Sequence, residues 1–200
     1  MKKILHIVSS PRGGASYSKQ LGDAIVAKLQ AANPGSVVKT VNLVEIHWPH
    51  LEEAHLNSFF TPVENYTDAN REAVRHSDEA IRDLNESDVI VIGAPMYNFN
   101  IHSALKAWID HIVRSGKTFA VKDGNPEGLV KGKKVYVAIS SGHVYSEGAL
   151  KSWDFMEPYL RTILGFIGLT DLTFFRVEGT NVAELKEHAM EKAVASIHLN

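Results

Sequence analysis

Uninterrupted apolar runs alternate along this chain with segments whose apolar residues recur at helical spacing. The clearest run covers residues 89–92, where four β-branched side chains follow one another. A strand of this kind is buried on both faces, as the central strands of parallel sheets are. Gly93 and Pro95 are predicted to end this strand, and helical spacing resumes over residues 104–112.

The same patterns predict further strands at residues 3–9, 37–43, 133–140 and 171–177. Polar residues interrupt the second of these, which is therefore expected at a sheet edge. Further helices are expected to begin at Ser16 or Ser18, to begin at Thr67 or Asp68, to contain Pro158, and to span residues 181–198. Pro158 predicts a kink or a late start because proline lacks the N–H that a helix interior requires.

Two segments do not follow these patterns. Residues 44–67 are irregular, and an excursion of this length in a compact domain is usually functional or part of an interface. Residues 117–121 are expected to be extended, and residues 122–128 are dense in turn formers and predict a surface loop.

Five strands separated by helices predict a doubly wound α/β fold, a parallel sheet with helices on both faces. The first strand is followed neither by Gly-x-Gly-x-x-Gly nor by a Walker lysine motif. The flavodoxin-like strand order 2-1-3-4-5 is therefore favoured, with its switch point between the first and third strands. Residues 1–200 are expected to form one domain.

Composition narrows the function classes. The chain has 21 basic and 23 acidic residues, a formal charge of -2, so neither nucleic acid nor a membrane surface is an expected partner. The absence of cysteine excludes disulfides and thiolate nucleophiles and is compatible with a reducing cytosol. The apolar run after the basic start is too short for a signal peptide or a membrane span, so a cytoplasmic protein is expected.

The turn after the first strand predicts a phosphate site. Backbone N–H groups and the dipole at a helix N-terminus attract phosphate, and short hydroxyl side chains add donors. The candidate residues are Ser10, Ser16, Tyr17 and Ser18. The alternative is that these serines only cap the helix, and this segment alone favours neither interpretation.

The residues of the loop after the third strand predict a binding site for a planar ring. Tyr97 and Phe99 bracket Asn98, which places apolar rings beside an amide at the carboxyl end of a central strand. Because the first and third strands are neighbours in this order, the phosphate and the ring would share one crevice, as in a bound mononucleotide. The segment at Ser140, after the fourth strand, would close the same crevice.

Four motifs resemble one known family: residues 94–101 (Ala-Pro-Met-Tyr-Asn-Phe-Asn-Ile), 125–129 (Asn-Pro-Glu-Gly-Leu), 132–134 (Gly-Lys-Lys) and 164–168 (Leu-Gly-Phe-Ile-Gly). The chain resembles the bacterial FMN-dependent NADH:azoreductases, also called NADH:quinone oxidoreductases, from its first strand to the region of Gly168. This resemblance implies a flavodoxin-like homodimer that binds one noncovalent FMN per protomer, with active sites at the dimer interface.

The resemblance also implies the FMN contacts. They are Ser10, Ser16, Tyr17, Ser18, Pro95, Met96, Tyr97, Asn98, Phe99, Ser140, Ser141, Gly142 and His143. The family commonly has Ser-Arg-Gly-Gly at the last four positions, so this chain lacks a permanent charge and has an imidazole in place of a glycine. His143 is a candidate modulator of the flavin or proton donor to the substrate; the alternative is a histidine on a solvent-facing loop.

The mechanism implied is a ping-pong hydride relay. NADH or NADPH gives a hydride to flavin N5 and leaves, and a quinone or an aromatic azo compound then takes the electrons. Because the flavin performs the redox chemistry, no catalytic side chain is predicted. The alternatives are a flavodoxin-type electron carrier that does not oxidise NADH, which would need a strongly acidic docking face, and a flavin-free binding module.

Other residues are expected to be structural. The set His47, His50, Glu52, Glu53 and His55 fits no zinc pattern, so no metal site is predicted. His102 and His111 are expected to pack on helix surfaces. Phe59 and Phe60 are interpreted first as a local hydrophobic cluster and second as part of a substrate wall contributed across a dimer.

Overall fold

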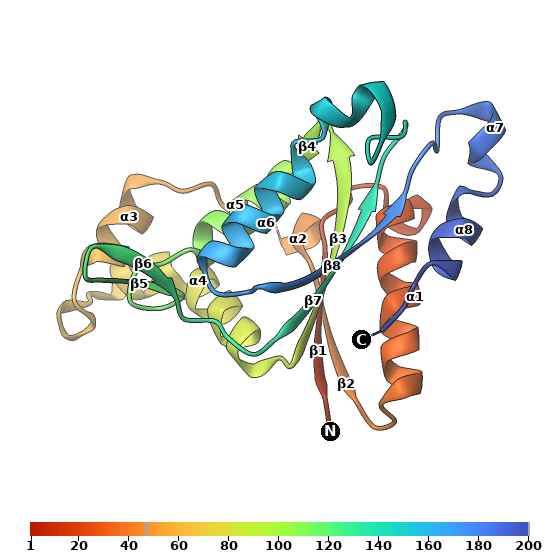
Figure 1. The fold of residues 1–200 in the computed structure, drawn as a ribbon. Helices are drawn as coiled ribbons and strands as arrows, with labels where there is room; N and C mark the ends of the chain where they lie inside the picture. The colour runs from red at the N-terminus through yellow and green to blue at the C-terminus, as the bar shows by residue number, and fades with distance from the viewer. Residues whose placement is uncertain (47, 200) are drawn as a thin grey trace.

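The apolar runs form the strands of a central sheet, and the segments with helical spacing cover its two faces (Figure 1). The computed structural model describes residues 1–46 and 48–199. The strands are β1 (Lys3–Val8), β2 (Val37–Asn42), β3 (Val89–Tyr97), β4 (Asn100–Ile101), β5 (Phe119–Lys122), β6 (Asn125–Gly128), β7 (Lys134–Ser140) and β8 (Asp171–Val177). The helices are α1 (Tyr17–Ala32), α2 (Leu43–Ile46), α3 (Glu53–Phe60), α4 (Asp68–Glu86), α5 (Ser103–Ile112), α6 (Met156–Phe166), α7 (Ala183–Lys186) and α8 (Ala189–Ala195), with 3-10 turns η1 (Gly13–Ala15), η2 (Val63–Asn65) and η3 (Gly148–Trp153).

The predicted strand order is confirmed. The parallel strands run β2-β1-β3-β7-β8, which is the flavodoxin-like order 2-1-3-4-5 when they are counted along the chain. The short strand β4 adds an antiparallel pairing to the end of β3. Strand β2 lies at the edge, as its polar residues predicted.

Successive residues of β3 enter two different cores. Ile90 and Ile92 pack with residues of α4, α5 and α6, whereas Val89 and Val91 pack with residues of α1 and α8. Figure 1 shows these two groups of helices on opposite sides of the sheet. Burial on both faces explains why the run contains no polar residue. In the described part of the chain, no helix has the length and apolar character required to cross a bilayer.

Strand β3 is longer than predicted. Gly93 and Pro95 do not end it, because pairing with β7 continues to Pro95 opposite Ser140. The pairing with β1 stops where Val8 lies opposite Gly93. At Ala94 and Pro95 only β7 pairs with the strand, so a residue without an N–H is tolerated there.

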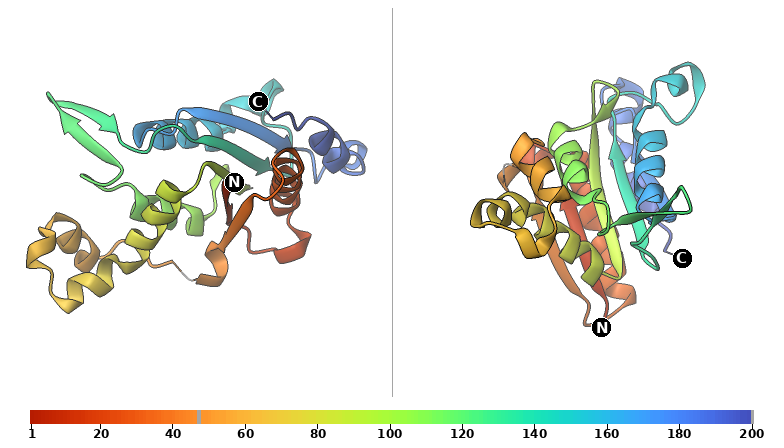
Figure 2. Two further views of the ribbon diagram at one scale, coloured as in Figure 1. Left: turned by 90° about the horizontal axis from the view of Figure 1, so that it is seen from below. Right: turned by 90° about the vertical axis from the view of Figure 1, so that its left-hand side faces the viewer.

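The predicted surface loop at residues 122–128 is instead half of a hairpin. Strands β5 and β6 pair antiparallel from Phe119 opposite Gly128 to Lys122 opposite Asn125. The two turn residues, Asp123 and Gly124, have φ of 52° and 80°. This is the left-handed geometry that Asp-Gly favours in tight hairpins. Figure 2 shows the hairpin projecting from the body of the protein.

Neither of the last two predicted helices is one continuous helix over its predicted range: the first starts late and the second is divided. Helix α6 has the late start that Pro158 predicted: residues 148–153 form η3, and Pro158 lies in the first turn of α6, where its missing N–H costs no intrahelical bond. The predicted helix at 181–198 is wrong as one element, because it divides into α7 and α8. Only its second part reaches the core, through Ala189, Ala193 and Ile197.

The excursion at residues 44–67 contains helix α3, which packs beside α4 far from the carboxyl edge of the sheet (Figure 1). Phe59 and Phe60 have different surroundings. The Arg114 guanidinium lies 4.4 Å from the centre of the Phe59 ring, whereas the Phe60 side chain is 81% exposed. The predicted local cluster therefore holds for Phe59 only.

Candidate functional site

The carboxyl ends of β1, β3 and β7 lie side by side and bring most of the predicted site residues to one edge of the sheet. Val8 of β1 is opposite Gly93, and Pro95 is opposite Ser140 of β7. The Ser9 hydroxyl donates to the Gly93 carbonyl over 2.7 Å, which ties the end of β1 to β3. In open α/β sheets this edge, at the switch point, is where ligands bind.

Buried hydroxyl groups surround the N-terminus of α1. Ser10, Ser16 and Ser18 are almost fully buried, and the Ser16 and Ser18 hydroxyl oxygens lie 3.2 Å apart. Ser16 caps the helix by accepting the Lys19 N–H over 3.2 Å. Other N–H groups of the first turn have no intrahelical acceptor. Capping and anion binding are thus compatible here, because the cap uses only one of several available donors.

The α1 N-terminus also lies close to β3. A Cβ atom on Gly93 would lie 3.2 Å from the Ser18 carbonyl oxygen, which is tighter than an ordinary contact. Glycine at this position therefore allows the serine turn to approach the end of the central strand. Tyr17, half-buried, packs against the core on the α1 side of the sheet.

The residues after Pro95 form what we call the ring loop, residues 96–99. Asn98 and Phe99 have φ of 48° and 68°, so two consecutive residues other than glycine adopt left-handed conformations. Such conformations cost free energy and persist where the surroundings hold them. Tyr97 and Phe99 are 37% and 40% exposed, so two aromatic rings reach solvent at the end of an otherwise buried strand.

The segment after β7 folds back on itself at the same edge. Ser140 and Ser141 are buried, and the Ser141 hydroxyl donates to the His143 carbonyl over 2.8 Å. A Cβ atom on Gly142 would lie 2.6 Å from the Asn181 amide nitrogen, so glycine is needed for this packing. The His143 side chain is exposed.

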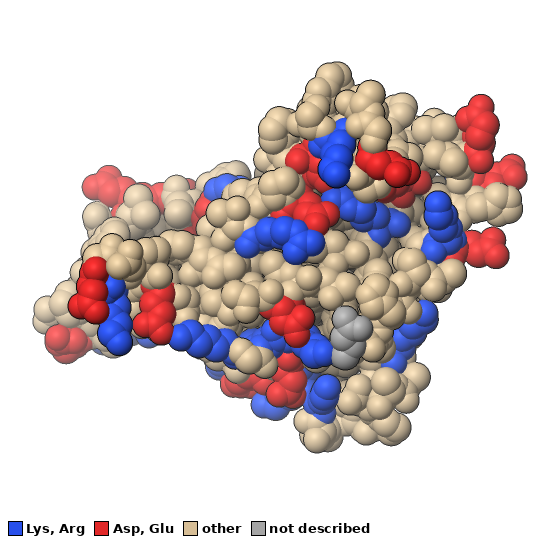
Figure 3. Space-filling model, in the orientation of Figure 1, with Lys and Arg blue, Asp and Glu red and all other residues tan. Residues whose placement is uncertain are grey.

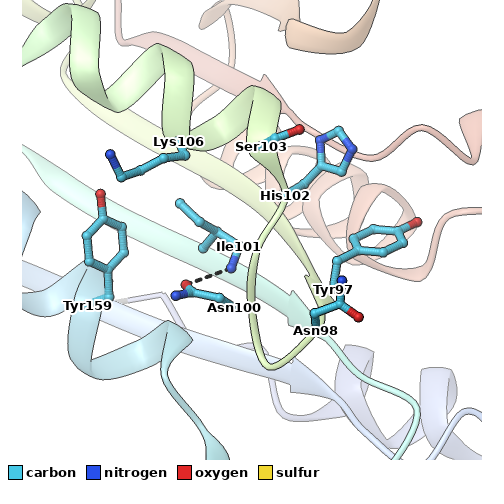
Figure 4. A pocket seen from close by; sticks show the side chains of 8 residues that line it. All are labelled: Tyr97, Asn98, Asn100, Ile101, His102, Ser103, Lys106 and Tyr159. Atoms are coloured by element: carbon cyan, nitrogen blue, oxygen red, sulfur yellow. Dashed lines mark hydrogen bonds between the residues drawn. The ribbon is translucent and has the colours of Figure 1, made fainter. Parts of the chain in front are cut away.

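A cavity of about 510 Å³ adjoins the ring loop on the α5 and α6 side of the sheet (Figure 4). It is lined by Tyr97, Asn98, Asn100, Ile101, His102, Ser103, Lys106 and Tyr159. Tyr97 and Asn98 are the predicted site residues that reach it. Helix α1, which begins at these serines, covers the face of the sheet opposite α5 and α6, and none of the serines lines the cavity.

The ionisable groups of this cavity are held in defined states. Burial lowers the pKa of His102, which is consistent with a neutral imidazole whose Nδ1 accepts the Ala104 N–H over 3.2 Å. Burial, with a smaller effect of Asp110, raises the pKa of Tyr159 to about 12, so its hydroxyl keeps its proton at neutral pH. Lys106 pairs with Asp110 at 2.6 Å, so its charge is compensated.

No strongly charged area accompanies the site. Figure 3 shows basic and acidic side chains interspersed over α6 and the segment above it. Among the described residues, no group of three or more His, Asp or Glu side chains is arranged to hold a metal. His55 instead accepts the Glu52 N–H over 3.0 Å in a capping interaction, and His47 lies outside the described residues.

A family model described as "Flavodoxin-like fold" matches residues 2–199. The chain belongs to this flavodoxin-like family. One curated relative of the flavodoxin-like chain is the FMN-dependent NADH:quinone oxidoreductase of Herminiimonas arsenicoxydans, 45% identical over 199 residues that cover 99% of this chain and 98% of the relative. Another, of the same name, is from Mesorhizobium japonicum, 41% identical, covering 97% and 93%.

A solved structure agrees with these relatives. The azoreductase of Bacillus anthracis strain Sterne superposes on the flavodoxin-like chain with a TM-score of 0.87 and 28% identity, covering 98% of each chain. The whole length of the two folds therefore corresponds, including the edge that carries the predicted site.

Several residues beside the site were not predicted. Lys106 and Tyr159 line the cavity from two different helices, and Tyr145 and Trp153 pack edge-on against Phe99. No local pattern distinguishes them, because each comes from a separate segment that only the folded chain brings to the ring loop.

For His111 the expected position on a helix surface is wrong: its side chain is fully buried, under the segment that precedes α3.

Proposed function

We propose that this flavodoxin-like chain is an FMN-dependent oxidoreductase that takes a hydride from NADH or NADPH and reduces quinones and aromatic azo compounds. The observation that carries the proposal is the convergence, at one sheet edge, of a buried hydroxyl cluster at a helix N-terminus with an exposed aromatic loop on the adjacent strand. The names of the relatives and of the similar solved structure support the same function.

The hydroxyl cluster fits the phosphate of FMN. Its donors are the hydroxyls of Ser10, Ser16 and Ser18 together with free N–H groups of the first turn, and such groups hold phosphate at helix N-termini. Tyr17 begins the helix and borders the same position. No side chain with a negative charge belongs to this set, so a dianionic phosphate meets donors only.

The ring loop and the β7 turn fit the isoalloxazine ring. Tyr97, Asn98 and Phe99 offer exposed aromatic and amide groups. The proposed ring contacts are Pro95, Met96, Tyr97, Asn98, Phe99, Ser140, Ser141, Gly142 and His143. His143 is exposed beside this set, a position from which an imidazole can influence the ring or a bound acceptor.

The residues of the chain contribute position rather than covalent chemistry. When bound, FMN would accept a hydride from the nicotinamide and pass two electrons to the acceptor. The ring loop and the adjoining cavity hold the flat reactants against each other, which is catalysis by proximity. Tyr159 keeps a proton at neutral pH and is available as a hydrogen-bond donor in the cavity. We place the protein in the cytoplasm, because a chain without cysteine suits a reducing compartment.

The first prediction tests this function. The protein is loaded with FMN and mixed with NADH in the absence of any partner protein, and the visible absorbance of the flavin is followed. Rapid bleaching, followed by recovery of the colour when a quinone or an azo dye is added, is expected.

The Ser16→Ala, Ser18→Ala double variant is expected to bind FMN more weakly by at least about tenfold, because two hydrogen bonds to a charged group are lost.

Persistent yellow colour in the presence of NADH and NADPH would contradict the proposal and favour a flavodoxin-type electron carrier. A preparation that takes up no FMN would favour a flavin-free binding module. The matched control for the serine variant is Ser115→Ala, an exposed residue between α5 and β5, which should bind FMN as the native protein does.

We also propose that the protein is a homodimer whose active sites lie at the interface and include Phe60 of the second protomer. This side chain is 81% exposed on α3, and an exposed phenylalanine at the end of a helix is a candidate contact residue. Phe59 has no such role in the proposal, since Arg114 and His111 already surround its ring.

The second prediction separates these two phenylalanines. Phe60→Ala is expected to raise KM for large azo acceptors by about fivefold to tenfold and to leave the melting temperature of the FMN-loaded protein nearly unchanged, since the ring has few contacts within one protomer. Phe59→Ala, the control, is expected to lower the melting temperature instead. The oligomeric state is measured by light scattering. A monomer, or identical acceptor kinetics in Phe60→Ala, would remove Phe60 from the site.

A further inference from the structure

Arg176, near the end of β8, pairs with three carboxylates. Its guanidinium lies 2.6 Å from Asp154, 2.5 Å from Glu157 and 3.4 Å from Glu178. The side chains of Arg176 and Asp154 are only 14% and 8% exposed. One charge at the sheet edge therefore connects β8, the start of α6 and the segment between β7 and α6.

Two of the carboxylates organise backbone beyond the arginine. Asp154 accepts the N–H groups of Met156 and Glu157 over 2.9 and 3.2 Å, so it caps the start of α6. Glu178 accepts the N–H groups of Tyr145 and Ser146 over 2.8 and 3.0 Å. We call residues 145–155 the aromatic segment, because it carries Tyr145, Trp153 and Phe155. Both ends of this segment are thus attached to carboxylates that pair with Arg176.

The aromatic segment in turn contacts the ring loop. The Phe155 N–H donates to the Phe99 carbonyl over 3.3 Å, and Phe155 directly follows the capping Asp154. The ring of Phe99 packs edge-on against Trp153 and Tyr145, with centroids 5.4 and 6.3 Å apart. Phe99 has a left-handed backbone that requires support from its surroundings, and these contacts provide it.

From these contacts we propose that Arg176 is a positioning residue for the ring loop, acting through Asp154 and Phe155 on the left-handed backbone of Phe99. The inference rests on the proposed function, in which this loop contacts the FMN ring. Arg176 itself does not touch the ring loop in this arrangement. Its effect is to keep Asp154 and Glu178 in the orientations that hold the aromatic segment against Phe99.

Hydrogen exchange of the FMN-free protein measures the positioning without relying on activity. In Arg176→Gln, the amides of Tyr145, Ser146 and Phe155 are expected to exchange at least about fivefold faster, since each loses the support of an ordered acceptor worth about one hydrogen bond. Arg176→Lys, which keeps the charge but cannot span three carboxylates, is expected to lie between this variant and the native protein.

Titration with FMN, followed by quenching of the flavin fluorescence, measures the consequence for the site. Arg176→Gln is expected to raise Kd for FMN by about fivefold. Asp154→Asn is expected to act in the same direction, because the amide oxygen still caps α6 while the charge that pairs with Arg176 is gone. This variant keeps the inference testable if Arg176→Gln fails to fold.

Arg161→Gln is the matched control. Arg161 also pairs with Glu157, and its guanidinium lies 4.3 Å from the Phe174 ring centre, yet no bond to Asp154 or Glu178 is recorded among the described residues. It should leave both exchange and FMN affinity within about twofold of the native values. Equal changes in Arg161→Gln and Arg176→Gln, or faster exchange with unchanged FMN affinity, would overturn the inference. If the native protein bound no FMN, the proposed function would fail, and the exchange comparison would still decide whether Arg176 holds the segment.

Discussion

Replacement of Gly128 by alanine is expected to lower the free energy of unfolding by at least about 3 kcal/mol, because the added methyl group would meet backbone that cannot move independently. A Cβ atom at this position would lie 2.2 Å from the Gly168 nitrogen and 2.4 Å from the Gly168 Cα. Contacts this short do not occur in proteins, so either the hairpin or the end of α6 would have to shift.

The backbone at Gly168 has little freedom to shift. Gly168 has φ of 102°, its N–H donates to the Gly165 carbonyl, and the Leu169 N–H donates to the Leu164 carbonyl, each over 2.9 Å. This pair of bonds is the Schellman motif that ends many helices with a left-handed glycine. A displacement at Gly168 would therefore break the termination of α6 and the start of the path to β8.

Urea unfolding of the FMN-free protein, followed by circular dichroism, measures this effect. Gly165→Ala is the matched control: it adds the same methyl group to α6 at a position where no atom other than those of its chain neighbours and its own helix backbone lies within 4 Å. The control is expected to be neutral or to stabilise the protein by up to about 1 kcal/mol through helix propensity. A Gly128→Ala midpoint equal to the native one would show that the hairpin moves freely relative to α6.

As the pH drops from about 6.5 to about 4, the free energy of unfolding is expected to fall in both the native protein and a His111→Gln variant. The fall is expected to be larger in the native protein, by up to about 3 kcal/mol. Burial is the main cause that lowers the pKa of His111 to about 4; His55 and His76 lower it further, whereas Asp110 and a hydrogen bond with Pro49 oppose the shift. Between these two pH values the unfolded chain binds a proton at this residue and the folded chain does not. Protons therefore favour unfolding throughout this window, and the loss is complete below the folded pKa.

The surroundings of His111 show why the proton is excluded. Its Nε2 lies 3.1 Å from the Pro49 carbonyl oxygen, a geometry in which the imidazole donates, and among the described residues its buried Nδ1 has no partner. The rings of His55, Trp48 and Phe59 pack around it at 4.9 to 6.1 Å. The Arg114 guanidinium, paired with Asp78 at 2.6 Å, lies 4.4 Å from the centre of the Phe59 ring. A second proton would place an unpaired charge among these rings and cations.

Glutamine is the informative replacement for His111, because its side-chain amide can still donate to the Pro49 carbonyl and does not titrate. Urea midpoints of both proteins between pH 4 and pH 7.5 give the difference directly, since every other titrating group is common to the two. His188→Gln, which removes a histidine that is 78% exposed, should retain the native profile. Parallel profiles for the native protein and His111→Gln would contradict the prediction.

Much of the architecture could be read from local patterns. The β-branched run at residues 89–92 identified the central strand, because only a strand buried on both faces excludes polar residues so completely. The pattern predicts Ser16 and Thr67 among the possible helix starts, and both cap helices in the structure. Gly165 and Gly168 mark the end of α6. These features depend on a residue and its near neighbours along the chain.

Two of the errors have a cause in the tertiary structure, and the third does not. Proline usually ends a strand, but here the pairing with β1 stops two residues before Pro95, so that Pro95 has a partner in β7 only. Residues 181–198 have a helical composition, yet only the part that packs on α1 and β8 reaches the core, so the helix divides. The hairpin at 119–128 was missed, although Asp123-Gly124 is a recognised hairpin turn.

The sequence by itself determined the strand order, the serine turn and the aromatic loop. These features follow from the spacing of apolar residues, from helix-capping residues and from turn-forming residues, each of which can be recognised within a few residues of the chain. Only the tertiary structure decided which side chains surround the ring loop. Arg176 and Asp154 are 22 residues apart, and their ion pair has no local signature because it exists only after β8 and α6 have packed. The same holds for the cavity between α5 and α6, and for the burial of His111.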